Sequence, residues 1–214
     1  MLNKKILLYS VGIFTLIIGF FYNENSSGGA EYDYNYLIPF VESFSKDFKN
    51  GLNLFVSDTG SLIHSPIFYI LTGGVLSIFG NINIVKIIYI LLSSTLPLIF
   101  YKILRLRGKD NIFLYLFSLI IFISPYFRSS SIWLLGDNLS LIFFGLSVLF
   151  YLKIEKNNFL LYACLSILFL AICCYIRYYY FPFYFFYIFA FLKKNNFKEI
   201  IKIFFFSLII AFPA

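Results

Sequence analysis

Several residues that could do chemistry lie in one polar stretch between two long apolar runs. The stretch covers residues 23–83 and contains the single histidine, His64, and six of the ten acidic residues. Two of these acids, Glu31 and Asp33, come soon after the first apolar run. A carboxylate held at a membrane surface can act as a general base that takes a proton from an acceptor hydroxyl or amine. The alternative is an ordinary solvated loop.

Arg177 is a candidate for binding a phosphate. A guanidinium offers a fixed fork of donors that matches phosphate oxygens, and a lysine ammonium does not. Lys86 and Arg128 could act as supporting cations, and Tyr178 follows Arg177 directly as a possible substrate contact. The alternatives are an arginine that extends to the membrane surface and an aromatic belt that contains Trp133, Tyr126, Tyr178, Tyr179 and Tyr180.

Asp137 and His64 complete the set of candidates. Asp137 could reach the same site as a further acid, or it could cap the helix that follows. His64 precedes Ser65 and Pro66, and proline is favourable at the first position of a helix. His64 could therefore contact a substrate or simply bond locally at this helix start. No second histidine is present for a zinc site, and the sequence has no glycine-rich phosphate loop.

The composition is typical of an integral membrane protein. Hydrophobic residues make up 61% and charged residues 13% of the sequence, and the mean hydropathy is +0.87, whereas roughly a quarter of the residues in a soluble domain are charged. The formal net charge is +7, but its lysines and arginines form short clusters between apolar runs and no continuous basic patch. We therefore expect cations that flank membrane spans, and no nucleic-acid partner.

Seven apolar runs have the character of spanning helices, which satisfy their own backbone polar groups in hydrocarbon. They cover residues 6–22, 84–104, 112–127, 132–152, 159–176, 178–192 and 203–214. An eighth run, residues 66–79, is short, starts with a proline and has two glycines at its centre, which suits a surface helix as well as a span. The sequence thus predicts an all-α, polytopic transmembrane bundle of about seven spans, with residues 1–214 as a single module.

The positive-inside rule decides whether residues 66–79 cross the membrane. If they do not, the cationic clusters at residues 4–5, 102–109, 153–156 and 193–202 all lie on the cytoplasmic side with the N-terminus. Residues 23–83 then form a first outer loop with surface helices, one of them over residues 36–48, where apolar residues recur at helical spacing. The same outer side collects ionisable residues from three loops, and such groups at a membrane boundary are candidates for function: Asp33, His64, Arg128, Asp137 and Arg177.

The order of these features resembles the C-type, multi-spanning glycosyltransferase superfamily, which takes sugars from polyprenyl-phosphate carriers. In that family a span leads to an outer loop with an acidic pair, a surface helix, and a proline motif before a Tyr-rich helix that ends in Phe-Gly. The matching segments here are Asp33-Tyr34, residues 36–48, His64-Ser65-Pro66-Ile67-Phe68-Tyr69 and Ile78-Phe79-Gly80. Further along, Lys86, Asp137 and Arg177 match a cation, an outer acid and an arginine of the family pattern.

The resemblance implies a membrane glycosyltransferase that moves a hexose or pentose, with inversion, to a glycan, lipid or protein acceptor of the cell envelope. It implies Asp33 or Glu31 as the base, neither a metal nor a cofactor, a bacterial inner-membrane location and an active loop outside. Tyr34 replaces the second acid of the family's pair, and the family continues beyond position 214 with more spans. The expectation is therefore an N-terminal module whose missing spans could come from a second chain. The alternatives are a membrane transporter, an assembly subunit or an inactive fragment.

Overall fold

The computed structural model describes residues 2–58, 65–108, 111–154, 158–193 and 197–211. All regular secondary structure in these ranges is helical, so the expectation of an all-α fold is confirmed for them. The elements are α1 (Leu2–Phe21), α2 (Ala30–Lys46), α3 (Phe48–Ser57), α4 (Ile67–Phe79), α5 (Ile82–Ser93), α6 (Thr95–Arg107), α7 (Ile112–Leu119), η2 (Ile120–Ile123), α8 (Pro125–Ile132), α9 (Gly136–Lys153), α10 (Phe159–Ile176), η4 (Tyr178–Tyr180), α11 (Pro182–Leu192) and α12 (Phe197–Ala211).

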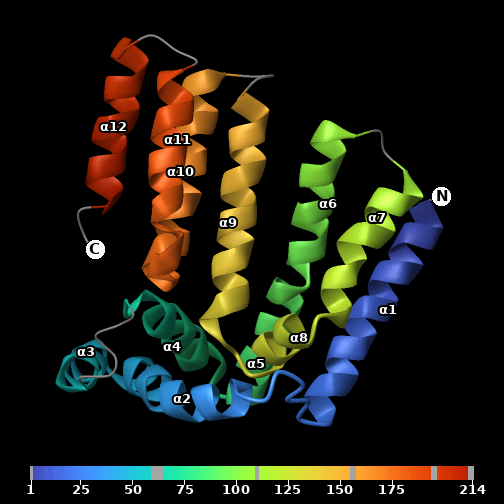
Figure 1. Cartoon of the computed structure of the whole chain (residues 1–214). Coiled ribbons are helices and arrows are strands. Elements are labelled where there is room, and N and C mark those ends of the chain that lie inside the picture. The colour runs from blue at the N-terminus through green and yellow to red at the C-terminus, as the bar shows by residue number, and fades with distance from the viewer. Residues whose placement is uncertain (1, 59–64, 109–110, 155–157, 194–196, 212–214) are drawn as a thin grey trace.

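The helices form two groups that differ in direction (Figure 1). The helices α1, α5, α6, α7 and α9 to α12 run along the long direction of the molecule, whereas α2, α3, α4 and α8 lie across one end. This end is called the covered end below. The end at which α6 and α9 finish is called the opposite end.

Several helices are long and apolar enough to cross a membrane. Among the described residues, three meet this condition, namely Asn3–Phe21, Ile82–Arg107 and Phe159–Ile176. A fourth does if Ile112–Ile123 and Pro125–Ile132, bent by 61°, count as one broken span. Large side chains of α1 face outward, as expected of a helix surrounded by hydrocarbon; Phe14 is 62% exposed. Length and composition thus support three or four spans, and the arrangement with seven stays a prediction.

Three of the expected spans are interrupted. Residues 84–104 lie within the candidate span Ile82–Arg107, which is divided at Ser94 into α5 and α6. Pro97 lies in the first turn of α6, where a missing N–H is tolerated. The run over residues 112–127 is broken at Ser124, where Pro125 starts α8. The run from residue 132 becomes α9 only at Gly136, because Leu134 has a positive φ of 56° in the turn before it. Residues 159–176, in contrast, form α10 as predicted.

Helices form at the covered end where the sequence predicts surface helices, with different boundaries (Figure 1). The helix predicted for residues 36–48 begins at Ala30 and ends at Lys46. Asp47 then caps α3, because its side chain accepts the backbone N–H of Asn50 at 3.0 Å. Glu31 and Asp33 therefore lie inside the first turn of α2 and not in a loop before it, a position at which the helix dipole favours negative charge.

Close packing joins α2 to α4 and places both against the bundle. An added Cβ at Gly73 of α4 would lie 2.8 Å from Cβ of Phe44 on α2, so a larger residue would push the two helices apart. Among the described residues, the larger of two buried apolar clusters includes residues of α2, α4 and α5, the turn before α9, and Ile176 at the end of α10. This cluster holds the start of α9 and the end of α10 beside the surface helices.

Candidate functional site

Asp137 and Arg177 form an ion pair at the covered end. Nη2 of Arg177 lies 2.9 Å from Oδ2 of Asp137, and the hydroxyl of Tyr179 donates to Oδ1 of the same carboxylate at 3.3 Å. Tyr126 of α8 also lies beside this carboxylate. The structure thus brings together the expected outer acid and the expected phosphate-binding arginine, which are 40 residues apart in the chain.

A close approach of two helix ends makes this pair possible. The helix α10 ends at Ile176, and the backbone of Arg177 is extended, with φ −141° and ψ 101°. A Cβ at Gly136, the first residue of α9, would lie 3.2 Å from Cγ2 of Ile176. Glycine at this position therefore allows the start of α9 to lie directly against the end of α10.

Asp137 lies in the first turn of α9 and does not cap the helix. The residue that precedes the helix is Leu135, and no side-chain hydrogen bond caps this end. The hydroxyl of Tyr89 instead bonds the carbonyl of Leu135 and accepts the N–H of Leu139, the latter at 3.2 Å. This buried tyrosine holds the first turn of α9, and with it the carboxylate of Asp137, in one place.

Arg177 keeps its charge in a largely buried setting. Burial disfavours the cation, but the carboxylate of Asp137, with Tyr179 and Tyr126, outweighs burial and raises the pKa of Arg177. The Arg177 side chain is 21% exposed and that of Asp137 9%, so the pair interacts more strongly than it would in water. A cleft of about 30 Å³ beside Arg177 has room for about one water molecule, and Leu37 of α2 is among its lining residues.

A large apolar groove opens next to the same cluster. This α6–α9 groove has a volume of about 460 Å³, and its polar residues are Ser124, Tyr126 and Asn138. Asn138 is fully buried, and its side-chain oxygen has no hydrogen-bond partner in the part of the chain that the structure describes. Tyr126 borders both the groove and the Asp137–Arg177 pair. An anionic head and an apolar chain could therefore be bound side by side.

Lys86 sits in an aromatic box a short distance along the covered end. Its ammonium lies 3.8 Å from the ring centre of Tyr34 and 4.7 Å from that of Trp133, a cation–π arrangement. Glu31 supplies a nearby negative charge. Trp133 is only 7% exposed, so it is a wall of this box and not the membrane-belt residue expected from the sequence.

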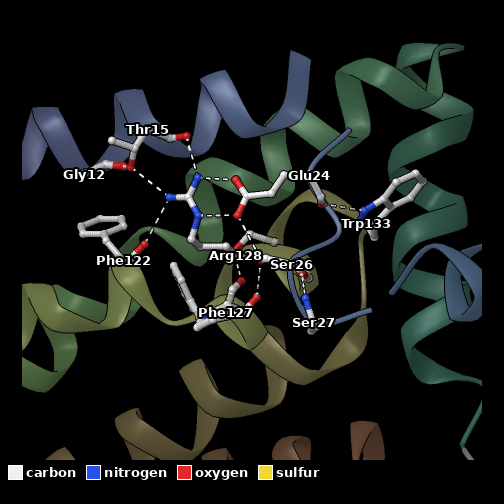
Figure 2. Close-up of polar contacts among 12 residues, drawn as sticks. Gly12, Thr15, Glu24, Ser26, Ser27, Phe122, Phe127, Arg128 and Trp133 are labelled. Atoms are coloured by element: carbon white, nitrogen blue, oxygen red, sulfur yellow. Dashed lines mark hydrogen bonds and ion pairs between the residues drawn. The ribbon is translucent and has the colours of Figure 1, made fainter. Parts of the chain in front are cut away.

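Arg128 joins α8 to the end of α1 (Figure 2). Its Nε donates to Oε1 of Glu24 at 2.7 Å, and Nη2 bonds Oε2 of the same carboxylate. Nη1 donates to the Thr15 hydroxyl at 3.1 Å and to the Phe122 carbonyl at 3.2 Å, and Nη2 also reaches the Thr15 carbonyl at 3.0 Å. A guanidinium has five N–H donors, and all five are used. No donor of Arg128 is therefore left for a substrate phosphate, in contrast to its expected supporting role.

Glu24→Gln is expected to lower the free energy of unfolding by about 3 kcal/mol, because Arg128 would keep a largely buried charge without its partner. The hydrogen bond from Arg128 lowers the pKa of Glu24 from its ordinary value of 4.5. A carboxyl group whose pKa is lower in the folded than in the unfolded state stabilises the protein. This stabilisation is fully present above the unfolded-state pKa, and it is lost as pH falls through the folded-state pKa. The difference between wild type and Glu24→Gln should therefore be constant above about pH 5 and shrink in more acidic solution. Denaturant unfolding in detergent micelles measures it.

Two further variants test this account of Glu24. Glu42→Gln removes an exposed acid of α2 at the same end and should change stability by less than about 0.5 kcal/mol. Gly19→Ala should destabilise, because its Cβ would overlap Oε2 of Glu24 and lie 3.1 Å from Nη2 of Arg128. A Glu24→Gln protein as stable as wild type at neutral pH would show that this ion pair is not structural.

Three of the remaining candidates, Glu31, Asp33 and Tyr178, lie at or near the covered end (Figure 1). Asp33 is exposed in the first turn of α2, and among the described residues no ion pair or side-chain hydrogen bond engages it. Glu31 is also exposed. Tyr178 is 60% exposed, with its ring centre 6.4 Å from that of Tyr179. His64 falls outside the described residues.

Several residues of this site were not expected from the sequence. The sequence assigns Tyr126 and Tyr179 to an aromatic belt and places Asn138 inside the apolar run of residues 132–152. Because Asn138 follows Asp137 directly in the sequence, it could have been suggested as a residue of the same site. Nothing local in the sequence indicates that Tyr126 faces the Asp137 carboxylate. Glu24 is one of the six acids in residues 23–83. Its position just after a span, on the same side as Arg128, is the one signal that could have suggested their pairing.

No family model, curated protein or solved structure matches the chain. The resemblance to C-type glycosyltransferases therefore stays an expectation drawn from the order of short motifs. The function proposed below rests on the geometry of the covered end together with that expectation.

Proposed function

We propose that this protein is a membrane glycosyltransferase that moves a sugar from a polyprenyl-phosphate carrier to a glycan, lipid or protein acceptor of the cell envelope. The observation that carries the proposal is the position of Tyr126, which borders both the Asp137–Arg177 pair and the α6–α9 groove. A ligand that occupies both places needs an anionic head and a long apolar chain. A polyprenyl-phosphate sugar has both.

In this proposal Arg177 binds the carrier phosphate and Asp137 holds the guanidinium in place. The hydroxyl of Tyr126 adds a donor to the phosphate at the mouth of the groove, and the apolar chain continues between α6 and α9. Charge-assisted hydrogen bonds from an arginine to phosphate are strong and directional. Lys86 supplies further positive charge from its box of aromatic side chains.

Asp33 is the proposed general base. It precedes Leu37 by one helical turn on the same face of α2, and Leu37 lines the cleft beside Arg177. The Asp33 carboxylate takes the proton of an acceptor hydroxyl, whose oxygen attacks the sugar carbon that carries the phosphate. The bond between this carbon and the phosphate oxygen breaks, and the configuration inverts. The departing phosphate keeps the electron pair and is stabilised by Arg177.

The distribution of charge supports the membrane orientation that this chemistry needs. All carboxylate side chains that the structure describes come from the covered end: Glu24, Glu31, Asp33, Glu42, Asp47, Asp58 and Asp137. Lysines and arginines at the ends of α6, α9 and α11 lie at the opposite end. By the positive-inside rule the opposite end is cytoplasmic and the covered end is outside. The seven spans are then α1, α5 with α6, α7 with η2, α9, α10, η4 with α11, and α12.

Cysteine labelling tests this orientation. In a variant that lacks Cys164, Cys173 and Cys174, Asp58→Cys should react with a membrane-impermeant maleimide added to intact cells. Arg107→Cys should react only after the membrane is opened, because it lies in the last turn of α6 at the opposite end. Reaction of Arg107→Cys in intact cells would make α4 a true span and would place the cationic clusters outside.

Transfer itself is tested in proteoliposomes. The purified full chain is supplied with polyprenyl-phosphate sugars that carry a radiolabelled hexose or pentose, and a cell-envelope fraction provides acceptors. The expected result is label in the acceptor together with an equal amount of released polyprenyl phosphate. A transporter or an assembly subunit would bind the carrier and leave the bond between sugar and phosphate intact. Failure to bind any carrier would reject the proposal.

A further inference from the structure

A second cavity opens between α6 and α9 at the opposite end of the bundle. Its volume is about 440 Å³, and its lining combines three cations with an apolar floor. The lining residues are Lys102, Arg105, Leu106, Leu146, Leu149, Phe150 and Lys153. None of them lines the α6–α9 groove, so this cationic cavity is distinct from the groove. Its place in the membrane rests on the orientation proposed above, and it does not depend on the proposed sugar transfer.

The cations come from two helices that end side by side. Lys102 and Arg105 are one turn apart near the end of α6, and Lys153 is the last residue of α9. The ammonium of Lys153 lies 5.4 Å from the ring centre of Phe150 and 6.0 Å from that of Tyr162. The Phe150 ring stacks on Phe169 with ring centres 5.4 Å apart and an angle of 5°. Positive charge therefore lies beside an apolar, aromatic surface.

This combination selects a class of ligand. Several converging cations favour a phosphate group, and basic pockets between helices on the cytoplasmic side of membrane proteins suit anionic lipid head groups. If a free phosphate ion occupied the cavity, the leucines and Phe150 would stay exposed to water. The glycerol and upper acyl chains of a bound lipid would cover these side chains. A zwitterionic lipid would bring its own ammonium group toward three cations.

We propose that this cationic cavity binds an anionic phospholipid of the leaflet that faces the opposite end. Its phosphate lies among Lys102, Arg105 and Lys153, and the first part of its acyl chains lies on Leu146, Leu149 and Phe150. The lipid joins the ends of α6 and α9, and the start of α9 carries Asp137 at the covered end.

Native mass spectrometry of the full chain tests the proposal. The protein is released from vesicles that contain equal amounts of phosphatidylglycerol and phosphatidylcholine with identical acyl chains, and the retained lipids are counted. Wild type should retain phosphatidylglycerol at least tenfold more than phosphatidylcholine. The triple variant Lys102→Gln, Arg105→Gln, Lys153→Gln should lose this preference, since each cation near an anionic lipid contributes several-fold to binding.

A matched control removes the same charge at the same end. Lys193→Gln, Lys198→Gln, Lys202→Gln changes three lysines that do not line the cavity, and its preference for phosphatidylglycerol should equal that of wild type. Equal thermal stability of all three proteins in pure phosphatidylcholine shows that they are folded. The proposal is wrong if the triple variant in the cavity keeps the preference, or if both triple variants lose it to the same extent. It is also wrong if millimolar inorganic phosphate displaces the lipid, because the cavity would then bind a free anion.

Discussion

Asp33→Asn should lower the rate of sugar transfer by about 10²–10⁴-fold, the usual contribution of a general base. The substitution keeps the size of the side chain and removes its ability to take a proton. Because Asp33 is exposed and no described side chain bonds it, the melting temperature and membrane insertion should not change. The measurement is the initial rate of label transfer in proteoliposomes at saturating carrier.

Glu31→Gln is the control for Asp33. Glu31 lies two residues earlier in the same turn of α2 and is also exposed, so the variant makes the same chemical change on another face of the helix. It should retain most of the activity. If Glu31→Gln abolishes transfer and Asp33→Asn does not, Glu31 is the base. If both variants retain full activity, neither acid of this helix takes the proton.

Arg177→Lys is expected to weaken binding of the polyprenyl-phosphate carrier by about 10- to 100-fold. A charge-assisted hydrogen bond contributes roughly 1.5–3 kcal/mol, which corresponds to about one to two powers of ten in affinity. Lysine keeps the positive charge, so the loss measures the planar donor fork and not the charge. Binding of undecaprenyl phosphate to protein in nanodiscs, followed by thermal shift or by displacement of a fluorescent analogue, is the measurement.

Arg128→Lys separates the two arginines at the covered end. All donors of Arg128 bond Glu24, Thr15 and Phe122, so the variant should lower stability and leave carrier affinity nearly unchanged. The opposite result, intact binding in Arg177→Lys and lost binding in a folded Arg128→Lys protein, would transfer the phosphate site to Arg128. Equal affinity in wild type and both variants would mean that neither arginine binds the carrier.

The amino-acid sequence by itself determined the class of fold and indicated which polar segments gather at the covered end. Long apolar runs must become helices if they enter hydrocarbon, because no other separate segment satisfies its backbone there. This constraint is local, and it predicted α10 as residues 159–176. The amphipathic spacing after the first run predicted a surface helix in the same way. Boundaries were less certain where serine, proline or a positive φ broke a run, as at Ser94, Ser124 and Leu134.

The tertiary structure decided which polar groups meet. The sequence predicts that Arg128, Asp137 and Arg177 lie on the same side of the membrane. This prediction does not say which of them form ion pairs, because the pairs join residues that are 40 and 104 positions apart in the chain. Partner choice depends on how closely helix ends approach, and that is set by packing at small residues such as Gly19 and Gly136. An ion pair forms where such packing removes two opposite charges from water together, since a single buried charge is unfavourable. Arg128 therefore pairs with Glu24, and Arg177 pairs with Asp137 beside the α6–α9 groove.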